Sequence, residues 1–347
     1  MADRYFPAQW RPQWGVLLAW PHPDTDWSDN LQAAEQCYTQ IISAISQYAN
    51  VLLLCHDNAH QAHITQCLQQ DNHCQLEKIY FRQLPYNDTW ARDFGAITVI
   101  ENDQAILLDF TFNAWGNKFD ASLDNAINQQ LVKQTPFRNR CLERHDLVLE
   151  GGSLESDGQG TLLTTETCLL NPNRNPSLSK TQIEQRLKDA LGLKRVLWLQ
   201  HGHLEGDDTD AHIDTLARFA DPQTIVYMSC DDPNDSHYTS LKAMEQEIQA
   251  FRQLNGEAYR LFPIPLSKPI YDAADGRRLP ASYVNFLIVN GAVLLPIYDA
   301  RTDNIAITQM QKAFPQHRII PIDCRALIKQ SGSLHCATMQ FPREIAG

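Results

Sequence analysis

The 347-residue chain has no apolar run close to the roughly 20 residues that a membrane-spanning helix needs. Its first residues, Met1 to Pro7, carry no apolar core of a secretory signal. The nine cysteines include no Cys-x-x-Cys pair, and their odd number argues for reduced thiols rather than a disulfide framework. These features predict a cytoplasmic protein without a structural zinc site.

The chain also has few basic residues: 29 Lys and Arg against 41 Asp and Glu, which gives a formal net charge of −12. Nucleic-acid binding needs a basic surface, so the balance argues against it. An acidic surface favours a cationic small molecule, although it also serves simply to keep a protein soluble. No linker or low-complexity segment divides the sequence. We therefore expect one domain spanning residues 1–347.

The N-terminal part alternates buried strands with helices, which indicates an α/β class. Strands are predicted at 15–20 and 51–55, and helices at 30–48 and 60–71. Further along, helices are predicted at 179–191, 239–255 and 305–313, and strands at 195–199 and 318–322. The proline-rich stretch 263–276 predicts a surface loop, with a lid as one interpretation.

A strand–turn–strand hairpin recurs along the chain. Its first strands are predicted at 92–100, 147–153, 211–219, 282–289 and 334–340, and the fourth hairpin turns at Asn290-Gly291, a strong hairpin signal. The leading polar residues Asp93, Glu150, His212, Ser282 and Cys336 are 57, 62, 70 and 54 residues apart. Repetition on this scale predicts a ring or stack of repeated units. A closed ring, with residues 334–340 pairing with strand 15–20, leaves no raw sheet edges.

A ring of hairpins would bring Asp93, Glu150, His212, Asp214 and Cys336 together. On a strand, His212 and Asp214 would face the same side. Carboxylates beside a thiol disfavour the thiolate, which makes sense if a cation is expected there. A planar guanidinium pairs with carboxylates and would assist ionisation of Cys336. The thiolate would then attack the central carbon, and His212 would move protons for the departing ammonia and the incoming water.

Each of these residues also has a plainer interpretation. Alone, Cys336 could be a buried thiol, His212 a core histidine, Asp93 an ion-pair partner of Arg92, and Glu150 part of a turn. The cluster His201, His203, Asp207, Asp208, Asp210, His212 and Asp214 invites a metal site, but a metal would quench the nucleophilic thiol. Tryptophans other than Trp90, including Trp115, are assigned to the core.

Five motifs, in order, carry a family resemblance. They are Trp90-Ala-Arg-Asp-Phe-Gly95, Glu150-Gly-Gly-Ser153, His212-Ile-Asp214, Ala281-Ser-Tyr-Val-Asn-Phe286 with Asn290-Gly291, and Leu334-His-Cys-Ala-Thr338. They resemble the agmatine deiminase family, which includes the bacterial peptidylarginine deiminase type, within the guanidine-modifying pentein superfamily. The resemblance implies a five-bladed α/β propeller of five pseudo-symmetric ββαβ units. It also implies no metal and no organic cofactor, and a homo-oligomer is a family-level expectation.

The resemblance further implies that Cys336 is the nucleophile and His212 the general acid/base. Asp93 and Asp214 would bind the guanidinium with Glu150 beside them, and Trp90 and Asp88 would wall the pocket or receive the far end of the substrate. The implied reaction is hydrolysis of agmatine to N-carbamoylputrescine and ammonia, a step of polyamine biosynthesis.

The sequence departs from the commonest family pattern in two places. Ser331-Gly-Ser-Leu-His-Cys336 stands where many members carry Gly-Gly-Asn-Ile-His-Cys, and the segment 201–210 also differs. Peptidylarginine deimination and amidino transfer therefore stay open as alternatives, as does a catalytically inactive binding protein with the same fold.

Overall fold

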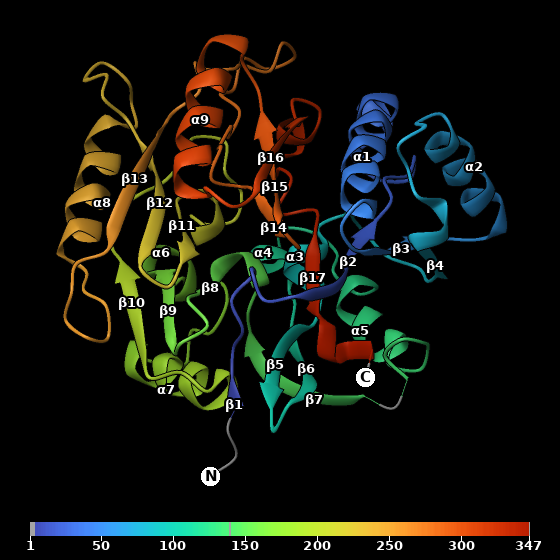
Figure 1. Ribbon diagram of the computed structural model, residues 1–347, viewed down its shortest axis with the longest axis horizontal. Helices are drawn as coiled ribbons and strands as arrows, with labels where there is room; N and C mark the ends of the chain where they lie inside the picture. Colours follow the sequence, from blue (N-terminus) through green and yellow to red (C-terminus); the bar gives the residue numbers. More distant parts are fainter. Residues whose placement is uncertain (1–3, 139, 347) are drawn as a thin grey trace.

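The computed structural model describes residues 4–138 and 140–346, and it arranges them as five small sheets around a common centre (Figure 1). In every sheet an antiparallel pair of strands is followed by a third strand that runs parallel to the second. A parallel neighbour needs a long crossover, and here each crossover contains helix. The predicted class, an α/β propeller of five ββαβ units, is confirmed.

The five sheets can be followed in the order of the chain. They are β17-β2-β3-β4 (Met339–Pro342, Gln13–Ala19, Asn50–Cys55, Ile79–Gln83), β1-β5-β6-β7 (Arg4–Tyr5, Ile97–Glu101, Gln104–Thr111, Cys141–Val148), β8-β9-β10 (Glu155–Ser156, Thr161–Thr165, Arg195–Leu199), β11-β12-β13 (Ala217–Asp221, Thr224–Ser229, Arg260–Pro265) and β14-β15-β16 (Leu287–Val289, Ala292–Ile297, Arg318–Asp323).

Helices fill the crossovers between the second and third strands. They are α1 (Leu31–Ser46), α4 and α5 (Ala114–Asn117, Ile127–Leu131), α6 and α7 (Glu166–Leu169, Lys180–Leu191), α8 (Tyr238–Ala250) and α9 (Ala300–Ala313), while α2 (Asn58–Gln69) joins β3 to β4 and α3 (Ala91–Phe94) precedes β5. The predicted helix 30–48 is confirmed in α1, which buries Cys37, Ile41 and Ile45 at helical spacing. Helix α7 begins with a capping box between Ser179 and Gln182.

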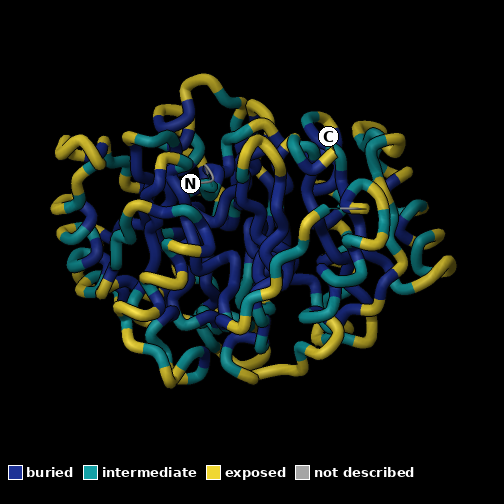
Figure 2. Tube along the Cα trace, turned by 90° about the horizontal axis from the view of Figure 1, so that it is seen from below, coloured by how far each residue is buried: buried dark blue, intermediate teal, exposed yellow. Residues whose placement is uncertain are grey.

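Burial falls from the centre of the ring to its rim. The first strands β5, β8, β11, β14 and β17 are almost wholly buried, whereas the outermost strands β4, β7, β10, β13 and β16 are mostly half-buried or exposed. Figure 2 shows the same gradient, with buried chain inside and exposed turns outside. The hairpin mouths therefore point inward, where side chains from all five units can meet.

The ring closes between the two ends of the chain. Strand β17 pairs antiparallel with β2, placing Met339 opposite Leu17 and Phe341 opposite Gly15. This confirms the predicted partnership of the C-terminal strand with the N-terminal one. The Asn290-Gly291 turn is also confirmed: both residues have positive φ (34° and 91°), as a tight hairpin requires.

Four of the predicted first strands begin too early, and the second is wrong, because residues 147–153 overlap the end of β7 and β8 begins only at Glu155. Arg92 and Asp93 lie in helix α3, residues 151–153 and 213–215 form turns of 3-10 helix, and residues 334–337 form a turn before β17. Hairpin pattern alone did not reveal this, because these turns are as buried as the strands they precede and run directly into them. A second correction concerns the segment 263–276, whose Pro263 and Pro265 belong to β13, a strand at the rim of its sheet where a missing N–H is tolerated.

Among the described residues, no helix is both long enough and apolar enough to cross a bilayer.

Ring closure generates a stability prediction. Phe341 of β17 is 1% exposed, and its ring packs edge-on against Phe137 at 4.7 Å between centroids. We expect Phe341→Ala to lower the free energy of unfolding by about 3–5 kcal/mol, because it leaves a cavity at the closing strand. Ile305→Ala, at a position 51% exposed on α9, should change it by no more than about 0.5 kcal/mol. Urea denaturation measures both, and equal effects would contradict the assigned role of the β17–β2 sheet.

Candidate active site

The predicted site residues do come together, each from the segment that leads into the first strand of its unit. Asp93 lies on α3, Glu150 just before the 151–153 turn, His212 and Asp214 at the 213–215 turn, and Cys336 before β17. All five are buried. His212 and Asp214 are not on a strand as predicted. His212 directly precedes a turn of 3-10 helix and Asp214 lies within it, and this turn, rather than strand alternation, places them.

His212 lies between two carboxylates. Its Nδ1 is 3.7 Å from Asp93 Oδ1, and its Nε2 is 3.8 Å from Glu150 Oε2. Burial disfavours a charged imidazole, but Asp93, Cys168 and Glu150 outweigh burial and raise the pKa of His212 well above its ordinary value. These neighbours favour the imidazolium, which is the form that can donate a proton.

Asp93 is held from two sides. Its Oδ2 accepts a hydrogen bond from Trp115 Nε1 (3.0 Å), and its Oδ1 accepts one from the backbone N–H of Gly152 (3.0 Å). Glycine is required at 152, because a Cβ there would lie 2.5 Å from His212 Nδ1 and 2.8 Å from Asp93 Oδ1. The Gly-Gly after Glu150 thus lets the backbone approach the reacting groups.

Glu150 pairs with an arginine that the sequence analysis did not identify. Arg174 Nε lies 2.9 Å from both carboxylate oxygens of Glu150, and its Nη1 donates to Asp210 Oδ2 at 2.6 Å. Burial acts to raise the pKa of Glu150, but His212 and Arg174 outweigh it and lower that pKa. A signal was available in Asn171-Pro-Asn-Arg-Asn-Pro176, a turn-rich segment with one charged residue between β9 and α7.

Cys336 is 5% exposed, and its Sγ lies 3.2 Å from Asn285 Nδ2 and 3.9 Å from Asp214 Oδ2. Asn285 Oδ1 also accepts from the backbone N–H groups of His335 and Cys336 (2.8 and 3.3 Å), so it fixes the turn that carries the thiol. Burial first, and then Asp214 and Asp93, raise the pKa of Cys336 well above its ordinary value. Burial also raises the pKa of Asp214 to about 7.

Cys336 lies on the wall of a cavity of about 240 Å³ that opens to solvent. The predicted residues Asp88, Trp90 and Asp93 line it, together with Asp26, Trp115, Phe119, Asp208, Thr209, Arg277, Gln330, Ser331 and Gly332. Trp115 is buried as predicted, but assigning it to the core alone was wrong, because its indole lies on the cavity wall and binds Asp93. The other predicted residues, Glu150, His212 and Asp214, are buried behind this wall rather than on it.

The histidine and aspartate side chains of segment 201–214 contact different partners and do not converge on one metal site. His201 pairs with Glu247 (2.7 Å), His203 with Ser240 (3.0 Å), and Asp210 with Arg174. Glu150, Cys168 and His212 do place one possible ligand atom each within 4.8 Å of one another. The guanidinium of Arg174 against Glu150 opposes a second cation there, which argues against metal ligation.

The chain is similar over nearly its whole length to proteins of one enzyme family. A family model described as Porphyromonas-type peptidyl-arginine deiminase matches residues 5–342. A candidate agmatine deiminase of Vibrio parahaemolyticus is 36% identical over 97% of this chain and 96% of its own. The crystal structure of a candidate arginine deiminase of Porphyromonas gingivalis has a TM-score of 0.90 at 47% identity, covering 98% and 99%. That of a cysteine-to-serine variant of C. jejuni agmatine deiminase with substrate bound has a TM-score of 0.90 at 39% identity, covering 98% and 96%.

The packing around Gly152 predicts a large kinetic effect. Gly152→Ala should lower kcat by about 100-fold or more, because the new Cβ displaces His212 and Asp93 from their present positions. Gly332→Ala is the matched control: its Cβ would strike the ring of Trp90 on the cavity wall, so KM should rise while kcat stays within a few-fold. Steady-state kinetics on both, with folding checked by circular dichroism, distinguishes the positions. Equal kcat for Gly152→Ala and the unaltered enzyme would contradict the geometry.

The environment of Cys336 predicts how the free thiol reacts. Because its pKa is raised well above the ordinary value, alkylation of Cys336 by iodoacetamide should increase about tenfold per pH unit from pH 7 to 9 without levelling. In Asp214→Asn one of the carboxylates that raise this pKa becomes neutral, so alkylation at pH 8 should be faster. Peptide mass spectrometry follows Cys336 separately from the other eight cysteines. A plateau below pH 8 in the unaltered enzyme would show that the thiol is already ionised.

Proposed function

The chain belongs to the Porphyromonas-type peptidyl-arginine deiminase family, and from that premise we propose that it is an agmatine deiminase, which hydrolyses agmatine to N-carbamoylputrescine and ammonia. Its relatives of known structure and curated relatives named as agmatine deiminases support this choice. The substrate is a small guanidine, and the enzyme is a hydrolase that acts on the C–N bond of a linear amidine.

One observation carries the choice of agmatine: the cavity joins the thiol to carboxylates that have no basic partner. Asp88 and Asp26 line the same cavity as Cys336, and neither forms an ion pair with a described residue. The hydrogen bonds that Asp88 accepts from Trp27 and Thr89 all use Oδ1, which leaves Oδ2 for a ligand. Agmatine has a guanidinium at one end and an ammonium at the other, so it matches both ends of the cavity.

The size of the cavity supports a small substrate. At about 240 Å³ it is below the range of roughly 300–1,000 Å³ that drug-sized ligands occupy. Trp90 and Trp115 provide flat apolar walls for the methylene chain of agmatine. A basic residue, Arg277, also lines the cavity, but Asp275 lies 3.3 Å from its Nε and balances its charge locally.

In the proposed mechanism Asp93 and Asp214 bind the guanidinium, and Oδ1 of Asp214 has no hydrogen-bond partner among the described residues. The bound cation offsets the carboxylates that raise the pKa of Cys336, so the thiol loses its proton to solvent. The Cys336 sulfur then attacks the central guanidinium carbon, and a C–S bond forms. Glu150, held by Arg174, keeps His212 in place as an imidazolium.

Ammonia departs when the imidazolium of His212 gives it a proton and the C–N bond breaks, which leaves an S-alkylthiouronium cation on Cys336. Neutral His212 next takes a proton from water as the water oxygen bonds to the same carbon. The C–S bond breaks, the hydroxyl proton leaves as the carbonyl forms, and N-carbamoylputrescine is released. The thiolate of Cys336 and the imidazolium of His212 are thereby restored.

We include the whole chain in one catalytic domain, because the residues of the proposed mechanism run from Asp93 to Cys336 and the sheet that closes the ring contains residues near both ends. We also place the enzyme in the cytoplasm, since all nine cysteines are free, as is usual in a reducing compartment.

Deimination of arginine, free or at the end of a peptide, is the second candidate. Two observations favour it: Arg277 at the cavity wall could bind a carboxylate, and the P. gingivalis structure that is 47% identical is a candidate arginine deiminase. Its chemistry at Cys336 would be the same, and only the far end of the substrate differs.

Ammonia release decides between these substrates. We expect the protein to release ammonia from agmatine, with much less from free arginine or a short arginine peptide, and Cys336→Ala to release none. Asp88→Asn keeps an oxygen for Trp27 and Thr89 but removes the charge, so KM for agmatine should rise while KM for 1-butylguanidine, which has no ammonium, stays unchanged. Preference for the peptide would overturn the substrate, and no ammonia from any guanidine would overturn the function.

A further inference from the structure

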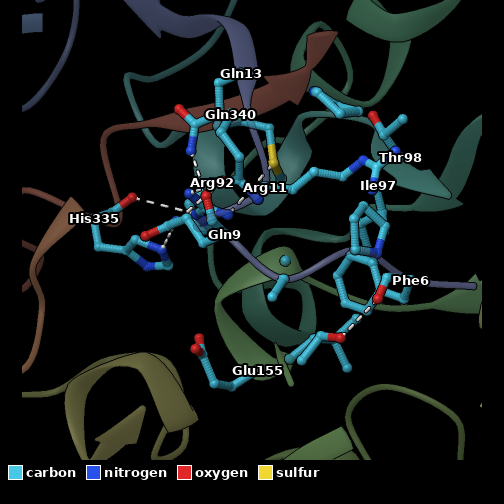
Figure 3. A pocket seen from close by; sticks show the side chains of 17 residues that line it. Phe6, Gln9, Arg11, Gln13, Arg92, Ile97, Thr98, Glu155, His335 and Gln340 are labelled. Atoms are coloured by element: carbon cyan, nitrogen blue, oxygen red, sulfur yellow. Dashed lines mark hydrogen bonds between the residues drawn. The ribbon is translucent and has the colours of Figure 1, made fainter. Parts of the chain in front are cut away.

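A buried polar network lies on the side of the reacting residues away from the substrate cavity. It surrounds a small cavity of about 30 Å³ between the N-terminal segment and the turn that carries Cys336 (Figure 3). Gln9, Arg92, His335 and Gln340 all line this cavity, and dashed lines join them in Figure 3. The side chain of His335 links this network to the site, because its Nδ1 lies 2.7 Å from Asp214 Oδ2.

The side-chain amide of Gln9 can adopt only one orientation. Its Oε1 accepts hydrogen bonds from Arg218 Nη2 (2.9 Å) and from the backbone N–H of Ile288 (2.8 Å), two groups that can only donate. A flipped amide would set its NH₂ against both donors. The Gln9 nitrogen therefore faces Gln340 Oε1 (3.1 Å) and His335 Nε2 (2.8 Å).

The neighbour at Gln340 is equally constrained. Its Oε1 accepts from Arg92 Nη2 at 2.7 Å as well as from Gln9, so this amide is oriented by a group that is always a donor. Gln9 thus uses both N–H bonds and both lone-pair directions of its amide. Any rotation of its side chain would break several buried hydrogen bonds at once.

The orientation of Gln9 determines the tautomer of His335. Because Gln9 donates at Nε2, that ring nitrogen must carry the lone pair, and the proton is on Nδ1. Burial and the nearby guanidiniums of Arg218 and Arg92 lower the pKa of His335 well below its ordinary value, so the ring stays neutral. His335 then donates from Nδ1 to Asp214 Oδ2, which leaves Oδ1 of Asp214 directed elsewhere.

We propose that Gln9 and His335 are positioning residues for the reaction: the fixed hydrogen-bond series Gln9–His335–Asp214 holds Asp214 with one oxygen anchored and the other presented to the guanidinium. The proposal rests on the proposed role of Asp214 in binding the substrate. Neither residue touches the substrate, and both act through Asp214. The N-terminal segment, 326 residues from His335, is thereby a part of the working site.

Nitrogen NMR on protein labelled with ¹⁵N-histidine tests the tautomer without substrate. The ring signals of His335, assigned by their absence from His335→Asn, should show a protonated Nδ1 and an unprotonated Nε2. In Gln9→Glu the group facing Nε2 becomes an acceptor, so Nε2 should become protonated. A protonated Nε2 in the unaltered protein, or no change in Gln9→Glu, would overturn the proposal.

Kinetics tests the consequence for the substrate. His335→Leu removes the donor to Asp214, and KM for agmatine should rise by roughly 10- to 100-fold, as for the loss of a hydrogen bond to a charged group. His335→Asn keeps an N–H near the position of Nδ1 and should recover most of that loss. Gln9→Glu should also raise KM, because His335 either turns its donor away from Asp214 or becomes a cation that competes with the substrate.

Thr98→Val is the matched control for these variants. Thr98 is buried and lines the same small cavity, but it forms no hydrogen bond with His335 or Gln9, so KM of the Thr98→Val variant should equal that of the unaltered enzyme.

A purely structural role for His335 would affect His335→Asn and His335→Leu alike, and that outcome would overturn the proposal. The two hypotheses can fail separately. The NMR spectrum tests the hydrogen-bond series Gln9–His335–Asp214 in the free protein, whereas absence of ammonia from every guanidine would contradict the proposed function alone.

Discussion

The antiparallel pairing of β17 with β2 is the contact on which the rest of the structure depends. It unites the two ends of the chain in one sheet and completes the ring of hairpin units. Cys336 lies just before β17, and its backbone oxygen accepts from the N–H of Arg92, the residue next to Asp93. The same closure therefore brings the thiol to the carboxylates that the other units contribute.

Charge at the centre of this ring is compensated unevenly. Glu150 is neutralised by Arg174, and Asp93 has Trp115, the Gly152 N–H and the nearby His212. Asp214 has a neutral histidine on one oxygen and, among residues 4–138 and 140–346, no hydrogen-bond partner on the other. Buried charges are costly without a partner. The proposed substrate supplies the missing cation, so binding and activation of Cys336 become one event rather than two.

In the proposed reaction, chemistry and specificity depend on different parts of the molecule. The residues proposed to react lie deep in the ring, whereas Asp26, Asp88 and Arg277 line the cavity that opens to solvent. Changes among these outer residues can alter the far end of the substrate without disturbing Cys336 or His212.

Local pattern was enough to predict the hairpins, the amphipathic helices and the five residues of the proposed mechanism, because turn residues, helical spacing and short motifs depend on neighbours in the chain. The starts of the inner strands were wrong, since the turns around Asp93, Glu150 and His212 are as buried as strands and continue directly into them. Tertiary structure alone decided that Arg174 pairs with Glu150, that Trp115 lines the cavity, and that Gln9 reaches His335. Such contacts join remote segments, and their existence depends on how the closed ring packs rather than on any periodicity in the sequence.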